Sequence, residues 1–255
     1  TRRSSDLVPW AAETVAMYYN TDLVDEPPET YADMQAIMEE IEYQNNDNHG
    51  LAMPLNPYFV SGFAQAYGKK IYDGETDSLA LTSDEVQQGL RLVFEDLAAY
   101  MPNSISPQDQ FLTFSDGNAA FYISGPWRIF HLNDNSLNWE VSTLPELPGG
   151  GIPRPYAGVD MLYFSAAMED SSNAGAARDF VKWFTTNNNL MTTAATQAGY
   201  LPLHQGIDER AMDETVPFRD QLETSIPIPQ DPKMEQVWRP LGNAVTETFN
   251  GNGEL

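Results

Sequence analysis

Short β-branched and aromatic runs alternate along the chain with longer stretches whose apolar residues repeat every three or four positions. Runs of the first kind are typical of strands, and stretches of the second kind are typical of amphipathic helices. The predicted strands cover 14–19, 51–55, 121–123, 139–144 and 159–165. This alternation predicts a mixed α/β protein.

Four helices are predicted. One begins near Thr30, a second covers 83–100, a third begins after Asn173, and the last covers 241–249. The Thr30 hydroxyl can cap a first turn, and Thr82 with Glu85 has the spacing of a capping box. Proline cannot occupy a helix interior without the loss of a hydrogen bond, so Pro240 is expected in the first turn of the last helix.

The sign of the charge is unusual. The 255 residues hold 37 Asp and Glu against 13 Lys and Arg, a formal net charge of −24, where small soluble domains usually carry a magnitude of about 2–8. Such a surface repels nucleic acid and anionic lipid, so no nucleic-acid partner is expected. Self-repulsion falls in concentrated salt, and this composition predicts a halophilic protein.

Several kinds of chemistry are excluded or unsupported. The chain has no cysteine and only three histidines, so it offers no thiolate site and little for a histidine-rich metal centre. No apolar run reaches the ~18 residues of a transmembrane helix. Sequence motifs for nucleophilic serines, phosphate loops, zinc proteases and dinucleotides are missing. The sequence therefore predicts no cofactor, no metal site and no identifiable catalytic residue, although a carboxylate pair stays open.

Aromatic residues stand beside turn-forming residues at four places. Tyr58 and Phe59 follow a proline, Trp127 follows Gly-Pro, Tyr156 follows a proline, and Trp238 precedes Arg-Pro. Flat aromatic faces suit the apolar C–H faces of sugars, while carboxylates and amides suit their hydroxyls. On composition alone, each such ring is more often part of a core than a ligand contact.

The order of several motifs resembles the maltose/maltodextrin-binding proteins, the sugar-binding subunits of ABC importers. The matching segments are 9–23 (PWAAETVAMYYNTDL), 27–31 (PPETY), 56–59 (NPYF), 114–121 with 125–127 (GPW), 139–145, 158–159 and 199–202 (GYLP). Their order and spacing hold from about residue 9 to about residue 250. The resemblance implies a periplasmic-binding-protein-like α/β fold with two hinged lobes.

The resemblance also implies roles for individual residues. Glu13 matches an acid near the hinge that accepts hydrogen bonds from sugar hydroxyls, and Tyr58, Trp127 and Trp238 match stacking positions. Tyr156 has no matching position. The further expected ligand-binding residues are Asn56, which stands in place of a glutamate, Phe59, and Arg239, which replaces an aromatic residue.

The same resemblance divides the chain. Residues 1–13 are expected to form the inter-lobe hinge strand, 14–161 with 211–255 the C-terminal ligand-binding lobe, and 162–210 a part of the other lobe. Most of that lobe and a final helix are expected to lie outside this sequence. The apolar stripe of Phe180, Val181 and Phe184 is then expected to be exposed or covered by another copy.

These expectations combine into one functional hypothesis and two alternatives. The first is a non-enzymatic, extracellular subunit that captures a maltodextrin-like carbohydrate between two lobes and delivers it to an ABC permease, with anchoring through a preceding segment. The second is a secreted glycoside hydrolase that uses two carboxylates. The third is an interaction module without a small ligand, in which the aromatic residues are core.

Overall fold

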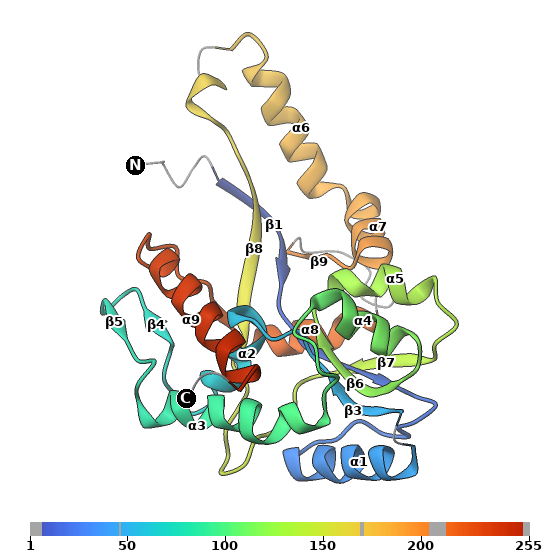
Figure 1. Cartoon of the computed structure of the whole chain (residues 1–255). Helices are drawn as coiled ribbons and strands as arrows, with labels where there is room; N and C mark the ends of the chain where they lie inside the picture. Colours follow the sequence, from blue (N-terminus) through green and yellow to red (C-terminus); the bar gives the residue numbers. More distant parts are fainter. Residues whose placement is uncertain (1–6, 46, 169–170, 204–212, 252–255) are drawn as a thin grey trace.

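Two four-stranded sheets and one short hairpin organise the part of the chain that the computed structural model describes, which is residues 7–45, 47–168, 171–203 and 213–251 (Figure 1). The strands are β1 (Leu7–Glu13), β2 (Ala16–Asn20), β3 (His49–Ala52), β4 (Tyr72–Asp73), β5 (Ser78–Leu79), β6 (Ala119–Ser124), β7 (Trp139–Ser142), β8 (Tyr156–Tyr163), β9 (Leu201–Pro202) and β10 (Ile226–Pro227). The spatial orders are β10-β8-β1-β9, β3-β6-β2-β7 and β4-β5.

Helices connect these strands. The α-helices are α1 (Tyr31–Gln44), α2 (Pro57–Ala64), α3 (Asp84–Arg91), α4 (Pro107–Ser115), α5 (Ile129–Asn133), α6 (Ala174–Thr186), α7 (Asn188–Ala198), α8 (Val216–Leu222) and α9 (Met234–Phe249). Short helical turns of other types are η2 (Leu92–Asp96), η3 (Leu97–Tyr100), η4 (Pro126–Arg128), η5 (Ala166–Met168) and η7 (Asp213–Thr215). The α/β class expected from the sequence is therefore confirmed.

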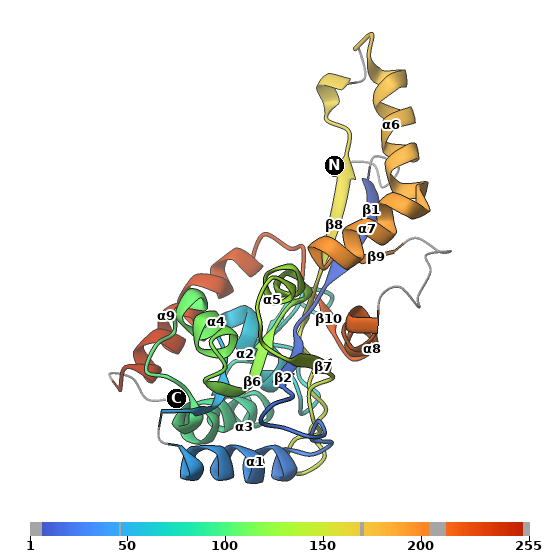
Figure 2. The same cartoon turned by 90° about the vertical axis from the view of Figure 1, so that its right-hand side faces the viewer.

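The sheet that contains β2 and β6 is buried on both faces. Every residue of both strands is buried, as a sheet covered by helices on each side requires. The larger core lies toward α1, α2, α3 and α9, and the smaller core lies toward α4, α5 and α8. This arrangement fixes the main body of the molecule (Figure 2).

β1 and β8 connect the main body to a projecting part. They pair antiparallel from Leu7 opposite Tyr163 to Glu13 opposite Gly158, and they run side by side toward α6 (Figure 1). The chain then passes from β1 to β2, and so from one sheet to the other, through the fully buried Thr14 and Val15. Glu13 thus lies where the two sheets meet.

The structure confirms one predicted helix start and shifts another by one residue. Thr30 caps α1 as predicted, because its hydroxyl accepts from the backbone N–H of Asp33 and the Asp33 carboxylate accepts in return from the Thr30 N–H. The helix predicted over 83–100 is wrong in detail, because it is α-helical only as far as Arg91 and continues as π and then 3₁₀ turns. Its cap is Ser83, whose hydroxyl accepts from Val86, and not Thr82.

The prediction for Pro240 is wrong. α9 begins at Met234, so Pro240 lies inside the helix and not in its first turn. The residues that α9 buries are Met234, Val237, Leu241 and Val245, which span both sides of the proline. Burial of this continuous apolar face outweighs the one backbone hydrogen bond that proline cannot make.

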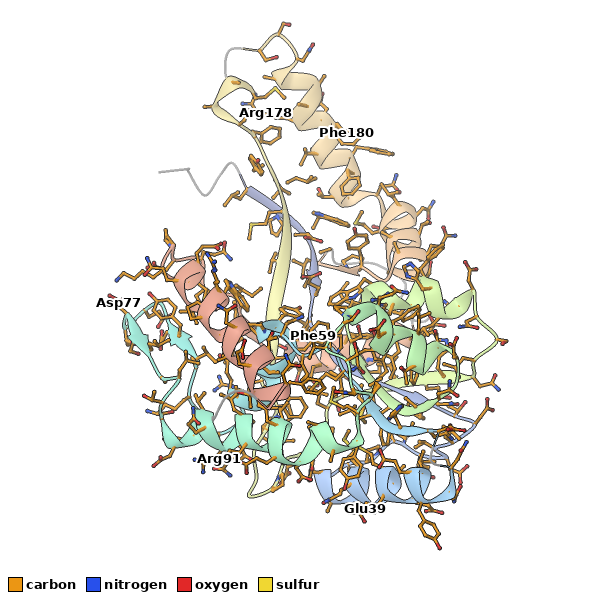
Figure 3. The ribbon with its side chains drawn as sticks, in the orientation of Figure 1. Glu39, Phe59, Asp77, Arg91, Arg178 and Phe180 are labelled. Carbon is orange, nitrogen blue, oxygen red and sulfur yellow. The ribbon has the colours of Figure 1, made fainter. Side chains whose placement is uncertain are left out.

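α6 projects from the main body (Figure 2). Phe180 is 57% exposed and Trp183 is 54% exposed, and Phe180 lies on this projecting helix in Figure 3. Val181 and Phe184 are only partly exposed. The expected exposure of the stripe therefore holds most strongly for Phe180, and the sequence analysis missed Trp183.

Candidate functional site

Glu13 is the last residue of β1, and its side chain lies across Gly158 of β8. A Cβ atom at position 158 would come within 2.8 Å of the Glu13 carboxylate, so only a glycine leaves room for it here. Burial raises the pKa of Glu13, and the negative charge of Asp160 raises it further. Asp160 lies two residues beyond Gly158 and therefore faces the same side of the strand.

Asn56 and Phe59 have structural roles at the start of α2. The Asn56 carboxamide oxygen accepts hydrogen bonds from the backbone N–H groups of Tyr58 (3.0 Å) and Phe59 (3.4 Å), and Pro57 occupies the first turn. Phe59 is only 7% exposed and belongs to the main core, at the centre of the body in Figure 3. The structure therefore places Asn56 as a helix cap and Phe59 as a packing residue.

Tyr58 projects from the same helix turn but remains partly exposed. Its hydroxyl is buried, and it has no hydrogen-bond partner among the residues that the structure describes. Burial raises its pKa strongly, and the charge of Glu13 raises it further, which makes these two side chains electrostatic neighbours. A buried hydroxyl without a partner is costly, so it is well suited to bind a polar ligand group.

Trp127 completes a group of three with Glu13 and Tyr58. The Trp127 and Tyr58 ring centroids lie 6.2 Å apart with an interplanar angle of 47°. The indole folds back over Gly125, where an added Cβ would come within 2.0 Å of the ring. The Tyr18 hydroxyl donates to the Gly125 carbonyl at 2.8 Å, so β2 helps to fix this turn.

Trp238 of α9 packs against Tyr156 of β8. Their ring centroids are 5.4 Å apart in an edge-to-face arrangement. Tyr156 is fully buried and lies two residues before Gly158, on the same face of β8. Trp238, Tyr58 and Trp127 all pack against the main core while remaining partly exposed. Arg239 is exposed on α9.

Tyr156 also links the strand to the helix that carries Tyr58. Its backbone N–H donates to the Ser61 hydroxyl at 3.0 Å, and the Ser61 hydroxyl donates to the Tyr58 carbonyl at 2.6 Å. The Thr14 hydroxyl donates to the Tyr156 carbonyl at 3.0 Å. In the sequence, Tyr156 is distinguished only by the proline before it, and its role cannot be predicted from there because these contacts join distant segments.

The aromatic residues of the site that stand beside turn-forming residues in the sequence lie in helical segments of the structure. Tyr58 lies in α2 and Trp238 lies in α9, while Trp127 lies in the short helical turn η4. Helices hold ring positions more firmly than loops, so the site has a preformed character. Its chemistry is that of flat apolar faces beside one half-buried carboxylate and an unpartnered hydroxyl.

Neither a metal centre nor a membrane span is evident in the described residues. No group of three or more His, Asp or Glu side chains there could hold a metal ion. Within the same ranges, no helix combines the length and the apolar character needed to cross a bilayer.

Solved structures share this fold. The crystal structure of MalX from Streptococcus pneumoniae in complex with maltopentaose aligns over 98% of this chain and 70% of its own, with a TM-score of 0.82 and 21% sequence identity. The periplasmic-binding-protein-like fold implied by the motif order is thus confirmed.

Curated relatives cover nearly the whole chain. The maltotriose-binding protein of Pyrococcus abyssi is 35% identical over 247 residues, which are 94% of this chain and 54% of the relative. The maltodextrin-binding protein MdxE of Bacillus subtilis is 26% identical over 265 residues, or 96% of this chain and 62% of the relative. The chain therefore spans little more than half the length of these relatives.

The family comparison agrees with both results. Residues 4–234 match the family described as bacterial extracellular solute-binding proteins. The match includes every residue of the Glu13, Tyr58 and Trp127 group. On this evidence the chain belongs to the bacterial extracellular solute-binding protein family.

Proposed function

We propose that this chain belongs to a sugar-binding subunit of an ABC transporter, which captures a maltodextrin-like oligosaccharide without covalent chemistry. The observation that carries the proposal is the convergence of Glu13, Tyr58 and Trp127 from three distant segments, with Trp238 nearby. Relatives named for maltotriose and maltodextrin binding support the same ligand class.

Each group in this site has a recognisable task. Tyr58, Trp127 and Trp238 offer faces and edges to the C–H surfaces of glucose rings. The Glu13 carboxylate accepts hydrogen bonds from sugar hydroxyls, and the Tyr58 hydroxyl supplies a further donor. In this proposal Arg239, which is exposed on α9 beside Trp238, donates hydrogen bonds at the edge of the site, whereas Asn56 and Phe59 support the site from α2.

The proposal divides the chain as the sequence analysis expected. The hinge strand is 1–13, the ligand-binding lobe is 14–161 with 211–255, and 162–210 belongs to a second lobe. The projection of α6 and its exposed Phe180 support this division. Residues 1–6, 46, 169–170, 204–212 and 252–255 of these ranges lie outside the described residues.

In this proposal the protein acts outside the cell, and its closed form docks on an ABC permease. Anchoring through a preceding segment stays part of the proposal. The family's description as extracellular solute-binding proteins supports the location.

Calorimetry of the intact protein in molar salt tests the proposal. We expect heat of binding with maltotriose and longer maltodextrins, and weaker or no heat with glucose. Trehalose and maltose extend the series, and amino acids serve as the negative set. Binding of amino acids alone, or of none of these compounds, would contradict a sugar-binding role.

A parallel assay addresses the hydrolase alternative, for which the neighbouring carboxylates Glu13 and Asp160 are the specific motivation. The intact protein is incubated with chromogenic α-glucosides under the conditions that give binding heat. We expect no turnover, and turnover that Glu13→Gln abolishes would favour the hydrolase.

A further inference from the structure

Gly199 ends α7 and touches the backbone of the turn that carries Trp127. Its φ of +68° lies in the left-handed region that favours glycine, and its N–H donates to the Ala195 carbonyl at 3.1 Å. A Cβ atom here would come within 1.7 Å of the Pro126 carbonyl oxygen and 3.2 Å of the Trp127 nitrogen. Gly199 is therefore required both for its φ and for this close approach.

The contact is made on one particular peptide unit. The Pro126 carbonyl and the Trp127 N–H belong to the same planar group, so displacement of one displaces the other and the Trp127 Cα. On its other side the turn is fixed by the Tyr18 hydroxyl, which donates to the Gly125 carbonyl. The turn is thus held between Tyr18 and Gly199, and the indole has little freedom to shift.

The residues after Gly199 pack against and pair with β1, the strand that carries Glu13. The Tyr200 ring lies 4.6 Å from that of Trp10, three residues before Glu13. Leu201 then pairs with Ala12 as β9 joins the edge of the sheet. α7 itself lies beside α5, which directly follows the Trp127 turn (Figure 1). One short connection therefore contacts both the Trp127 turn and the strand of Glu13.

We propose that Gly199 is a positioning residue of the ligand site. Because Gly199 lets the end of α7 pack directly on the Pro126–Trp127 peptide, it fixes the position of the Trp127 ring relative to Glu13 and Tyr58. It touches no ligand itself. The inference rests on the proposed sugar-binding function, and it adds that a segment assigned to the second lobe controls the geometry of the first.

A matched pair of variants in the intact protein tests this role. Gly199→Ala adds both backbone strain and the collision with Pro126. Gly150→Ala adds the same kind of strain, because Gly150 has a φ of +81°, but a Cβ there meets nothing within 4 Å. Both variants are expected to lower the unfolding midpoint. Only Gly199→Ala is expected to weaken maltotriose binding, by about tenfold or more, mainly through faster dissociation.

The comparison separates positioning from stability. If both folded variants bind maltotriose as tightly as the unmodified protein, Gly199 is structural only and the proposal is overturned. Equal losses of affinity in the two variants also overturn it. If the unmodified protein binds no sugar, the proposed function fails first, so the two failures can be told apart.

A measurement on the unmodified protein covers the case in which Gly199→Ala does not fold. Coupling is reciprocal, so bound maltotriose must stabilise the end of α7 if α7 stabilises the bound site. We expect slower hydrogen exchange at the amides of Gly199 and Tyr200 with ligand present. Unchanged exchange there, alongside slowed exchange at Tyr58, overturns the proposal.

Discussion

The Glu13 carboxylate occupies the space that a side chain at Gly158, its cross-strand partner, would fill. Gly158→Ala is therefore expected to displace the carboxylate from the site and to weaken maltotriose binding by about 1–2 kcal/mol. Gly175→Ala is the control, because a Cβ there meets nothing within 4 Å. Calorimetry measures both variants.

A double-mutant cycle sharpens this prediction. In a Glu13→Ala background the collision is gone, so the added Gly158→Ala is expected to change maltotriose binding little. Independent, additive effects of the two substitutions would show that Gly158 acts on binding by another route.

Glu13→Gln is expected to separate stability from binding. The folded-state pKa of Glu13 is raised above its ordinary value near 4.5, because burial and Asp160 disfavour the charged form. Its ionisation therefore destabilises the native state as pH rises from about 4 through the raised pKa. The variant is expected to be more stable than the unmodified protein at pH 7 and equally stable below about pH 4.

Maltotriose binding is expected to change in the opposite direction. A neutral amide accepts hydrogen bonds more weakly than a carboxylate, so the affinity at pH 7 falls by about tenfold. Thermal unfolding from pH 3 to pH 8 and calorimetry at pH 7 measure the two effects. A stability difference that is independent of pH would argue against a raised pKa.

Loss of the Trp127 ring or of the Trp238 ring is expected to weaken sugar binding. Trp127→Ala and Trp238→Ala are each expected to cost about 1–3 kcal/mol of maltotriose binding, in the range of a planar ring stacked on an aromatic side chain. Trp183→Ala is the matched control, since Trp183 is 54% exposed on α6, away from the site. Full affinity in the two site variants would assign both tryptophans to packing.

Salt is expected to stabilise the protein. The net charge of −24 creates self-repulsion in the compact state, which is screened as the Debye length falls from about 30 Å at 0.01 M to about 3 Å at 1 M. The partly exposed Lys70–Asp73 ion pair and the exposed Lys233–Asp77 ion pair contribute little to stability, so their screening by salt costs little. Urea unfolding in increasing KCl measures the gain.

The kind of salt identifies the cause. Charge screening acts mostly below a few tenths molar salt and depends little on the anion. Stabilisation by salts that are excluded from the protein surface continues to rise with concentration, and it is stronger for sulfate than for chloride. A gain seen only with sulfate would point away from charge repulsion and from a halophilic protein.

Local sequence signals predicted several elements well. The Thr30 cap and the strand around 121–123 follow from side-chain capping and from β-branched and aromatic preference, which act over a few residues. Pro240 shows where such reasoning fails, since tertiary burial on both sides of it holds α9 together. Motif order likewise identified the Asn56–Phe59 segment, but it could not tell which side chains α2 would bury.

By itself, the sequence determined the α/β class, the net negative charge, the family and the positions along the chain of the aromatic residues beside turn-forming residues. Only the tertiary structure decided that Tyr58 lies within the electrostatic influence of Glu13, that Phe59 is core, and that Gly199 packs directly against Pro126. Periodicity and capping depend on residues within one or two turns of each other. These contacts instead join strands and helices far apart in the chain, and their geometry is set by close packing of the whole body.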